Sequence, residues 1–252
     1  QRNSYKSWFP SSSKNKVYSN MTKPFTDFKE DLRLFCSENK IDNDKISIVG
    51  VSKKKSLEDI LGLYRLGLRD FGENYAQELN EKSLALDLGK IRWHFMGPIQ
   101  TNKIGLIVKN SYLVHSVDRE KVLRKMDFES KKINKIQKVL VQVNISGEDS
   151  KSGILPGDAE EFINLADSFD NLELNGLMFM PNINQDKASH IKEIRDSVTL
   201  FNDMKSKRSN LQVLSLGTSS DYKECIKAGS NLIRVGEILF GPRVWFIIQS
   251  YE

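Results

Sequence analysis

The chain has 252 residues, which is enough for one α/β barrel domain. Its composition, 39% hydrophobic and 28% charged, is typical of a soluble globular protein. No apolar run approaches the ~20 residues of a membrane-spanning helix. The net charge of +5 does not indicate a nucleic-acid site, because the lysines are interspersed with acids and no nucleic-acid motif accompanies them. The two cysteines, Cys36 and Cys225, exclude a disulfide framework and a zinc spacing, so we expect a cytoplasmic protein with no metal site.

The first 24 residues differ in composition from the rest. No acid occurs before residue 27, whereas five basic residues do, namely Arg2, Lys6, Lys14, Lys16 and Lys23. We expect residues 1–24 to be a disordered basic extension and residues 25–252 to form the folded domain. An organelle-targeting segment is an alternative, although the apolar spacing is poor for one. A true start at Met21 is another.

From residue 25 onward the chain predicts one helix, Phe25–Glu38, followed by eight alternating strands and helices. The strand segments are rich in valine, isoleucine, leucine and aromatic residues and show little strict alternation. That pattern is typical of parallel strands covered on both faces. The predicted strands are Ile46–Val51, Arg69–Phe71, Arg92–Phe95, Tyr112–His115, Lys138–Asn144, Leu172–Met178, Gln212–Leu216 and Leu232–Val235.

Amphipathic segments lie between these strands. Ser56 with Asp59 predicts a capped helix start, and Gly67 predicts the end of that helix. Asp118 and Asp158 predict two further caps. Eight strand–helix repeats after one extra helix predict a single (β/α)8 TIM barrel with an extra N-terminal helix. A doubly wound open sheet is the main alternative, but the chain has no Gly-x-Gly-x-x-Gly fingerprint.

Polar residues recur where the predicted strands end, and in such a barrel these ends share one rim. Lys53 follows the first strand, where it can supply a nucleophilic amine. Gly217 and Gly236 follow the seventh and eighth strands, where bare amides can approach a phosphate. An amine and a phosphate cradle at one rim indicate a phosphorylated aldehyde, for which pyridoxal 5′-phosphate (PLP) is the first candidate.

Each of these residues also has a purely structural interpretation. Lys53 begins a run of three lysines, which is usually a solvated loop, and residues 215–220 could form a capped turn. Arg234 could be an ordinary ion-pair partner, and His94 and His115 could be core histidines. Their joint placement at one rim favours a binding site.

The chain resembles the pyridoxal phosphate homeostasis protein family (YggS/PROSC), whose fold is like the N-terminal barrel of alanine racemase. The resemblance covers residues 25–243. The motifs that carry it are Val51-Ser52-Lys53, Phe71-Gly72-Glu73-Asn74-Tyr75, Trp93-His94-Phe95-Met96-Gly97, Gln100-Thr101-Asn102-Lys103, His115-Ser116-Val117-Asp118, Gln142-Val143-Asn144-Ile145-Ser146-Gly147-Glu148, Lys151-Ser152-Gly153, Gly176-Leu177-Met178 and Phe240-Gly241-Pro242-Arg243.

This resemblance implies roles for individual residues. Lys53 would form a Schiff base with PLP, and Arg234 would lie against the pyridine nitrogen. Asn74 and His94 would line the pocket, and Lys55 corresponds to a second family lysine. The phosphate would be held by Ser215, Gly217, Thr218, Ser219, Gly236 and the backbone of Glu237.

Two of these positions depart from the commonest family pattern. Thr218 stands where methionine is usual, and its hydroxyl could still serve a phosphate. Glu237 stands where a small hydroxylated residue is usual. Because a carboxylate would repel a phosphate, we expect its side chain to turn away from the site and only its amide to donate.

The resulting hypothesis is a monomeric PLP carrier or regulator in PLP and amino-acid homeostasis, with PLP-dependent apoenzymes as its partners and no robust turnover. An arginine beside the ring opposes its protonation and makes it a weak electron sink. The alternative is a PLP-dependent amino-acid racemase with Lys53 as the base. A third is a phosphosugar lyase in which Lys53 acts without a cofactor.

Overall fold

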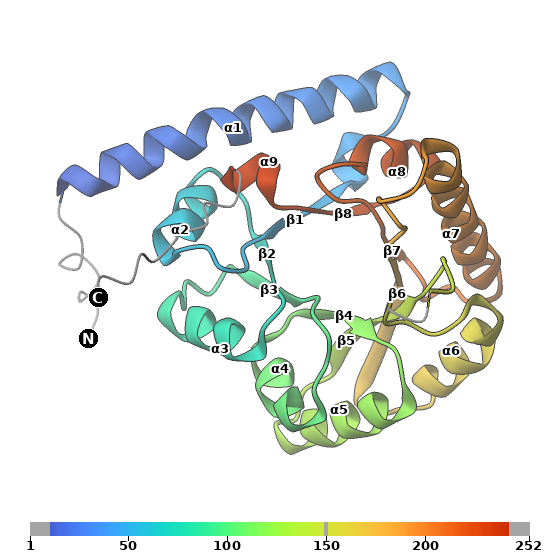
Figure 1. Cartoon of the computed structure of the whole chain (residues 1–252). Coiled ribbons are helices and arrows are strands. Elements are labelled where there is room, and N and C mark those ends of the chain that lie inside the picture. The colour runs from blue at the N-terminus through green and yellow to red at the C-terminus, as the bar shows by residue number, and fades with distance from the viewer. Residues whose placement is uncertain (1–10, 149–150, 242–252) are drawn as a thin grey trace, which may run out of the picture.

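The computed structural model describes residues 11–148 and 151–241, and within them eight parallel strands close into a barrel (Figure 1). Neighbouring strands follow the chain order, and β8 completes the ring by pairing with β1. The predicted (β/α)8 barrel is therefore confirmed. The strands are β1 Ser47–Val51, β2 Asp70–Glu73, β3 Arg92–Phe95, β4 Leu113–Val117, β5 Gln137–Val143, β6 Leu172–Phe179, β7 Val213–Ser215 and β8 Leu232–Val235.

Helices surround the barrel on its outer side (Figure 1). In the part of the chain that the structure describes, none of them combines the length and the apolar character needed to cross a bilayer. The helices are α1 Ser11–Glu38, α2 Leu57–Arg65, α3 Ala76–Ala85, α4 Ile104–Asn110, α5 Glu120–Lys132, α6 Ala159–Asp167, α7 Lys187–Lys207, α8 Tyr222–Ala228 and α9 Glu237–Phe240.

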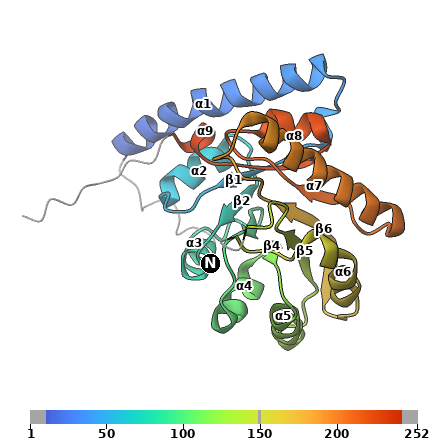
Figure 2. The same cartoon turned by 45° about the vertical axis from the view of Figure 1, so that its right-hand side comes forward.

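Helix α1 lies across the outside of the barrel, against α2 and α9, as both views show (Figures 1 and 2). Among residues 22–38, whose burial the structure describes, α1 buries Phe25, Phe28, Leu32 and Cys36, which share one face of a helix. Over α8, the ring of Tyr222 meets Phe28 edge-on at 5.5 Å, and the Tyr222 hydroxyl donates to Asp31 at 2.6 Å. The extra helix is thus part of the hydrophobic core.

The start of α1 differs from the predicted helix boundary. The helix begins at Ser11 rather than Phe25, so its backbone includes residues 11–24 of the segment that we expected to be disordered. Residues 1–10 lie outside the described residues. Extending an existing helix costs little once the first turn has formed, which explains helix in a stretch without apolar periodicity.

The predicted helix caps differ in their outcome. Ser56 and Asp59 form the reciprocal capping box of α2, as predicted. The prediction for Asp118 was wrong, whereas Asp158 lies at the predicted position but without the capping bond. Asp118 instead binds the adjacent Arg119, which occupies the N-cap position of α5. Asp158 occupies the N-cap position of α6, but its helical backbone angles leave its side chain without a capping bond.

The approach of β6 to β7 leaves no room for a side chain at Gly176. This residue pairs with Val213, and a Cβ atom added there would lie 1.8 Å from the Val213 carbonyl oxygen. Backbone atoms cannot move aside as a flexible side chain can. The close pairing of β6 and β7 therefore requires glycine at this position.

We predict that Gly176→Ala lowers the free energy of unfolding by at least about 2 kcal/mol, because the new methyl group forces two barrel strands apart. Gly157→Ala is the matched control, since no atom lies within 4 Å of its added Cβ, and it should change stability by no more than about 0.5 kcal/mol. Thermal unfolding followed by circular dichroism measures both. Equal midpoints for the two variants would contradict the prediction.

Candidate functional site

A cavity of about 360 Å³ opens at the carboxyl ends of the strands. Its volume falls within the range of small-molecule sites in proteins. Seven of the residues predicted from the sequence line it, namely Lys53, Asn74, Thr218, Ser219, Arg234, Gly236 and Glu237. The remaining lining residues are Val51, Met96, Met178, Met180, Ile183 and Ser220.

Lys53 lies on the turn that follows β1 and is partly buried. The turn spans residues 52–55 and is closed by the amide of Lys55, which donates to the carbonyl oxygen of Ser52 at 3.0 Å. Lys55 itself points elsewhere, because its ammonium group donates to the carbonyl oxygen of Phe240 at 3.3 Å. Lys53 therefore lines the cavity, whereas Lys55 is directed toward Phe240 at the end of α9.

The loop after β7 forms another part of the cavity wall. Gly217 has a φ angle of +109°, which only glycine adopts readily, and this conformation turns the chain toward Thr218. The amide and the hydroxyl of Thr218 both donate to Asp221, at 2.6 and 2.8 Å. Gly217 is not among the lining residues, and the donors of Thr218 are directed to a carboxylate.

The turn after β8 approaches this loop directly. The amide of Gly236 donates to the Ser219 hydroxyl at 3.1 Å, so the two predicted phosphate-binding segments are in contact. Glu237 follows as the first residue of α9 and is exposed. Ser219 and Ser220 present hydroxyls at the cavity wall, and hydroxyl and amide groups are suitable ligands for a phosphate.

Arg234 lies beneath the cavity and is 6% exposed. Its guanidinium donates to the Ser215 hydroxyl at 2.5 Å and to the carbonyl oxygen of Phe179 at 2.8 Å. Burial lowers the pKa of Arg234 to about 10, so the group is still charged at neutral pH. Ser215 is fully buried behind Arg234 and does not line the cavity, although the sequence predicted it as a phosphate ligand.

His94 does not line the cavity either, contrary to the prediction. It is buried inside the barrel, where its Nε2 lies 2.9 Å from Asp70 and its Nδ1 lies 2.8 Å from Nε2 of His115. Nδ1 of His115 in turn lies 2.9 Å from the Ser215 hydroxyl. A continuous hydrogen-bonded chain therefore connects Asp70 to Arg234 through the interior of the barrel.

With both histidines neutral, the Asp70 end sets the direction of these hydrogen bonds, because a carboxylate can only accept. At the other end, Ser215 accepts from Arg234 and donates to the unprotonated Nδ1 of His115. His115 then donates to His94, and His94 donates to the Asp70 carboxylate. Each histidine is neutral in this arrangement. Burial, together with His94 and Arg234, holds the pKa of His115 well below its usual value, in agreement with this assignment.

Asp70 is anchored at the far end of the chain. Burial raises its pKa, but hydrogen bonds from Arg92 and His94 outweigh burial and hold the pKa below its ordinary value. Arg92 donates to both carboxylate oxygens, at 2.6 and 2.5 Å. The hydrogen-bonded chain inside the barrel therefore ends at a charged carboxylate that accepts two hydrogen bonds from Arg92.

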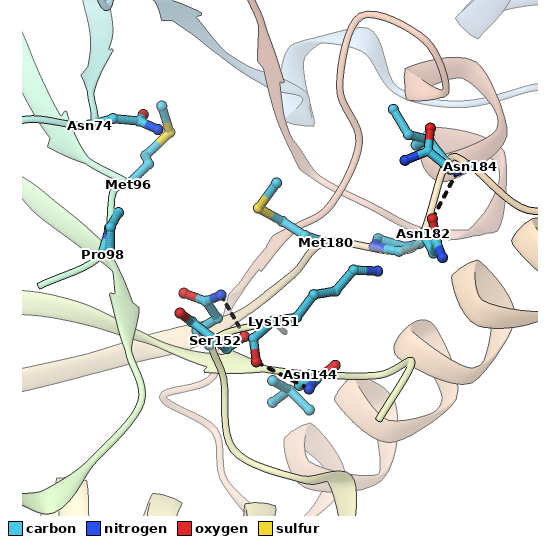
Figure 3. Close-up of a pocket in the computed structure, with 13 residues that line it drawn as sticks. Asn74, Met96, Pro98, Asn144, Lys151, Ser152, Met180, Asn182 and Asn184 are labelled. Atoms are coloured by element: carbon cyan, nitrogen blue, oxygen red, sulfur yellow. Dashed lines mark hydrogen bonds between the residues drawn. The ribbon is translucent and has the colours of Figure 1, made fainter. Parts of the chain in front are cut away.

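A second cavity of about 360 Å³ adjoins the first (Figure 3). The two share Asn74, Met96, Met180 and Ile183 as lining residues. Figure 3 shows Met96 and Asn74 on one side of this cavity and Lys151 with Asn182 on the other. Met180 and Ile183 were missed from the sequence because apolar residues beyond a strand end give no chemical signal; they are 51% and 58% exposed.

Comparison with known proteins places the chain among relatives. The model of the family "Alanine racemase, N-terminal domain" matches residues 45–244. The chain is 36% identical over 204 residues to a pyridoxal phosphate homeostasis protein of Vibrio alginolyticus, which covers 79% of this chain and 88% of the relative. It is also 36% identical to the Haemophilus influenzae protein of the same name, over 85% of this chain and 92% of the relative.

Solved structures agree with these sequence matches. PipY of Synechococcus elongatus, solved with PLP bound, superposes with a TM-score of 0.73 at 26% identity, covering 83% of this chain and 99% of PipY. An alanine racemase of Clostridium difficile, at 16% identity and a TM-score of 0.67, shares the fold over 85% of this chain and 57% of the racemase. From the identity and coverage of its relatives, the chain belongs to the pyridoxal phosphate homeostasis protein family, within the alanine racemase N-terminal domain family.

Proposed function

We propose that this protein binds PLP as a Schiff base on Lys53 and acts as a carrier or regulator in PLP homeostasis. The observation that carries the proposal is that one cavity is lined by the amine of Lys53, the guanidinium of Arg234, and the hydroxyl and glycine residues after β7 and β8. Related proteins are named for PLP homeostasis, and PipY was solved with PLP bound. The residues present therefore fit this cofactor.

The aldehyde end of PLP would face Lys53. The Lys53 amine would condense there with the aldehyde, whose oxygen would leave as water. The turn after β1 holds Lys53 at the rim, so the amine is in place before the cofactor arrives. The reverse reaction with water releases the cofactor unchanged, as a carrier requires.

The phosphate end would face the segments after β7 and β8. Ser219 supplies a hydroxyl donor there, and Gly236 allows the backbone to approach. The Ser220 hydroxyl lies 3.0 Å from that of Thr218 and donates to it, because the Thr218 hydroxyl donates to Asp221. Thr218 supports the loop by binding Asp221 and contributes less directly than the sequence indicated. Exposed Glu237 lies at the edge of the cavity, where its carboxylate can turn toward solvent and leave its amide as the donor.

The ring nitrogen would face Arg234. A charged guanidinium offers only donors, so it opposes protonation of the pyridine ring. An unprotonated ring withdraws electrons weakly and stabilises a carbanion poorly. This electrostatic environment favours storage and transfer of PLP over racemisation of amino acids.

We predict that the purified protein has the visible absorption band of a PLP Schiff base and that Lys53→Ala abolishes the band. Borohydride reduction followed by peptide mapping should find the cofactor on Lys53. Lys227→Ala, which removes an exposed lysine of α8, is the control and should keep the band. A reduced adduct on another lysine would refute the assignment, and a colourless protein that takes up no PLP would favour the cofactor-free lyase.

Incubation with single enantiomers of amino acids in deuterated water tests the racemase alternative. We expect no exchange of the α-proton beyond that caused by free PLP, because Arg234 keeps the ring unprotonated. Mass spectrometry measures the exchange, and chiral chromatography measures inversion. Rapid exchange accompanied by inversion would establish an enzyme and reject the carrier function.

A further inference from the structure

The turn that carries Lys53 has an unfavourable backbone conformation. Residues 52–55 form a turn closed by a 3.0 Å hydrogen bond, and its third residue, Lys54, has a φ angle of +60°. Turns with a positive φ at the third residue usually have glycine or asparagine there. A lysine at this position is sterically disfavoured, so contacts from elsewhere must hold the turn in place.

Helix α3 supplies these contacts on both sides of Lys53. The carboxylate of Glu78 accepts the amide of Lys54 at 2.6 Å. The ammonium group of Lys82, one helical turn further on, donates to the carbonyl oxygen of Ser52 at 2.7 Å. Glu78 and Lys82 also pair with each other at 2.7 Å. The peptide groups that flank Lys53 are therefore both bound to one ion pair.

Glu73 anchors this ion pair in the barrel. It is fully buried, accepts from Lys82 at 2.8 Å and accepts from the Ser52 hydroxyl at 2.6 Å. Burial raises its pKa despite the pairing, and its second carboxylate oxygen has no hydrogen-bond partner among the described residues. Buried ion pairs with an unsatisfied oxygen contribute little net stability. A positioning role explains the network better than stability does.

We propose that Glu78 and Lys82 are positioning residues for Lys53, which hold its turn in the left-handed conformation at Lys54 and so direct the amine into the cavity. This inference rests on the proposed PLP function. The turn is set by contacts within the protein itself, so the amine is ordered before the cofactor binds. Preorganisation of this kind strengthens binding because less ordering remains to be done in the complex.

The test uses the full chain and compares three variants with the wild type. Glu78→Ala removes the acceptor of the Lys54 amide. Glu81→Ala, on the exposed face of the same helix, is the matched control. Glu78→Ala combined with Lys54→Gly restores a residue that adopts a positive φ freely, without restoring the carboxylate. PLP titration followed by the visible band gives the dissociation constant, and thermal unfolding without PLP reports stability.

We expect Glu78→Ala to weaken PLP binding roughly tenfold, in line with the loss of a charge-assisted hydrogen bond. Lys54→Gly should recover most of this loss in the double variant, whereas Glu81→Ala should stay within about twofold of the wild type. Thermal unfolding of the same variants without PLP separates this rescue from a change in overall stability, because glycine also relieves the strain at a positive φ. Should Glu78→Ala fail to fold, Glu78→Leu, which also lacks an acceptor but fills more of the space, with and without Lys54→Gly provides the same comparison.

Two results would overturn the proposal. One is wild-type PLP affinity in Glu78→Ala, and the other is a double variant that binds as weakly as Glu78→Ala alone. Both results are distinguishable from failure of the proposed function. If the proposed function failed, the wild type itself would form no Schiff base on Lys53, and there would be no visible band with which to compare the variants.

Discussion

The site depends on the pairing of the last strand with the first. In the β1–β8 register Val235 lies opposite Gly50, so the chain leaving β1 toward Lys53 runs beside the chain leaving β8 toward Gly236. A Cβ atom on Gly236 would lie 3.4 Å from the carbonyl oxygen of Val51, which shows how closely the two segments approach. Closure of the barrel thus sets the separation between the amine and the turn after β8.

The hydrogen-bonded chain inside the barrel adds a second constraint, because a charged group stands at each of its ends. It ends in a carboxylate at Asp70 and in a guanidinium at Arg234, and the fully buried His115 and Ser215 lie between them. The guanidinium can only donate, and its hydrogen bonds to Ser215 and to the carbonyl oxygen of Phe179 hold it in place. The interior therefore holds Arg234 charged and fixed in orientation. A pyridine ring above it would meet a donor that does not give up its proton.

Much of this architecture could be predicted from the sequence, since strand and turn signals are local. The predicted bounds of Arg92–Phe95 and Leu232–Val235 match the structure, and the others differ by one or a few residues. The polar residues at strand ends were informative because a parallel barrel brings these ends to one rim. On this basis the sequence predicted one site for Lys53 and Arg234, which are far apart in the chain, and both residues line the same cavity.

The roles of the other predicted site residues depend on where their side chains point, and a strand pattern does not determine that direction. His94 lies one residue before the end of β3 and could face the cavity or the deeper interior; the structure has it bound to Asp70, below the cavity. For Thr218 a local signal existed, because Asp221 three residues later can capture both its amide and its hydroxyl. For α1 only residues 11–24 were missed, because they lack an apolar stripe and continue a helix that packs further along the chain.

The groups that would bind the two ends of the cofactor differ in kind, and this difference supports the carrier proposal. At the proposed phosphate end the donors are hydroxyls and amides, Thr218 is engaged by Asp221, and the Glu237 carboxylate lies nearby. At the opposite end, buried charges fix the turn that bears Lys53. The covalent bond is then the stronger attachment in the proposed complex, and water or an incoming amine can break it without any oxidant. Racemisation requires a carbanion to be stabilised, which an unprotonated ring beside Arg234 would do only weakly.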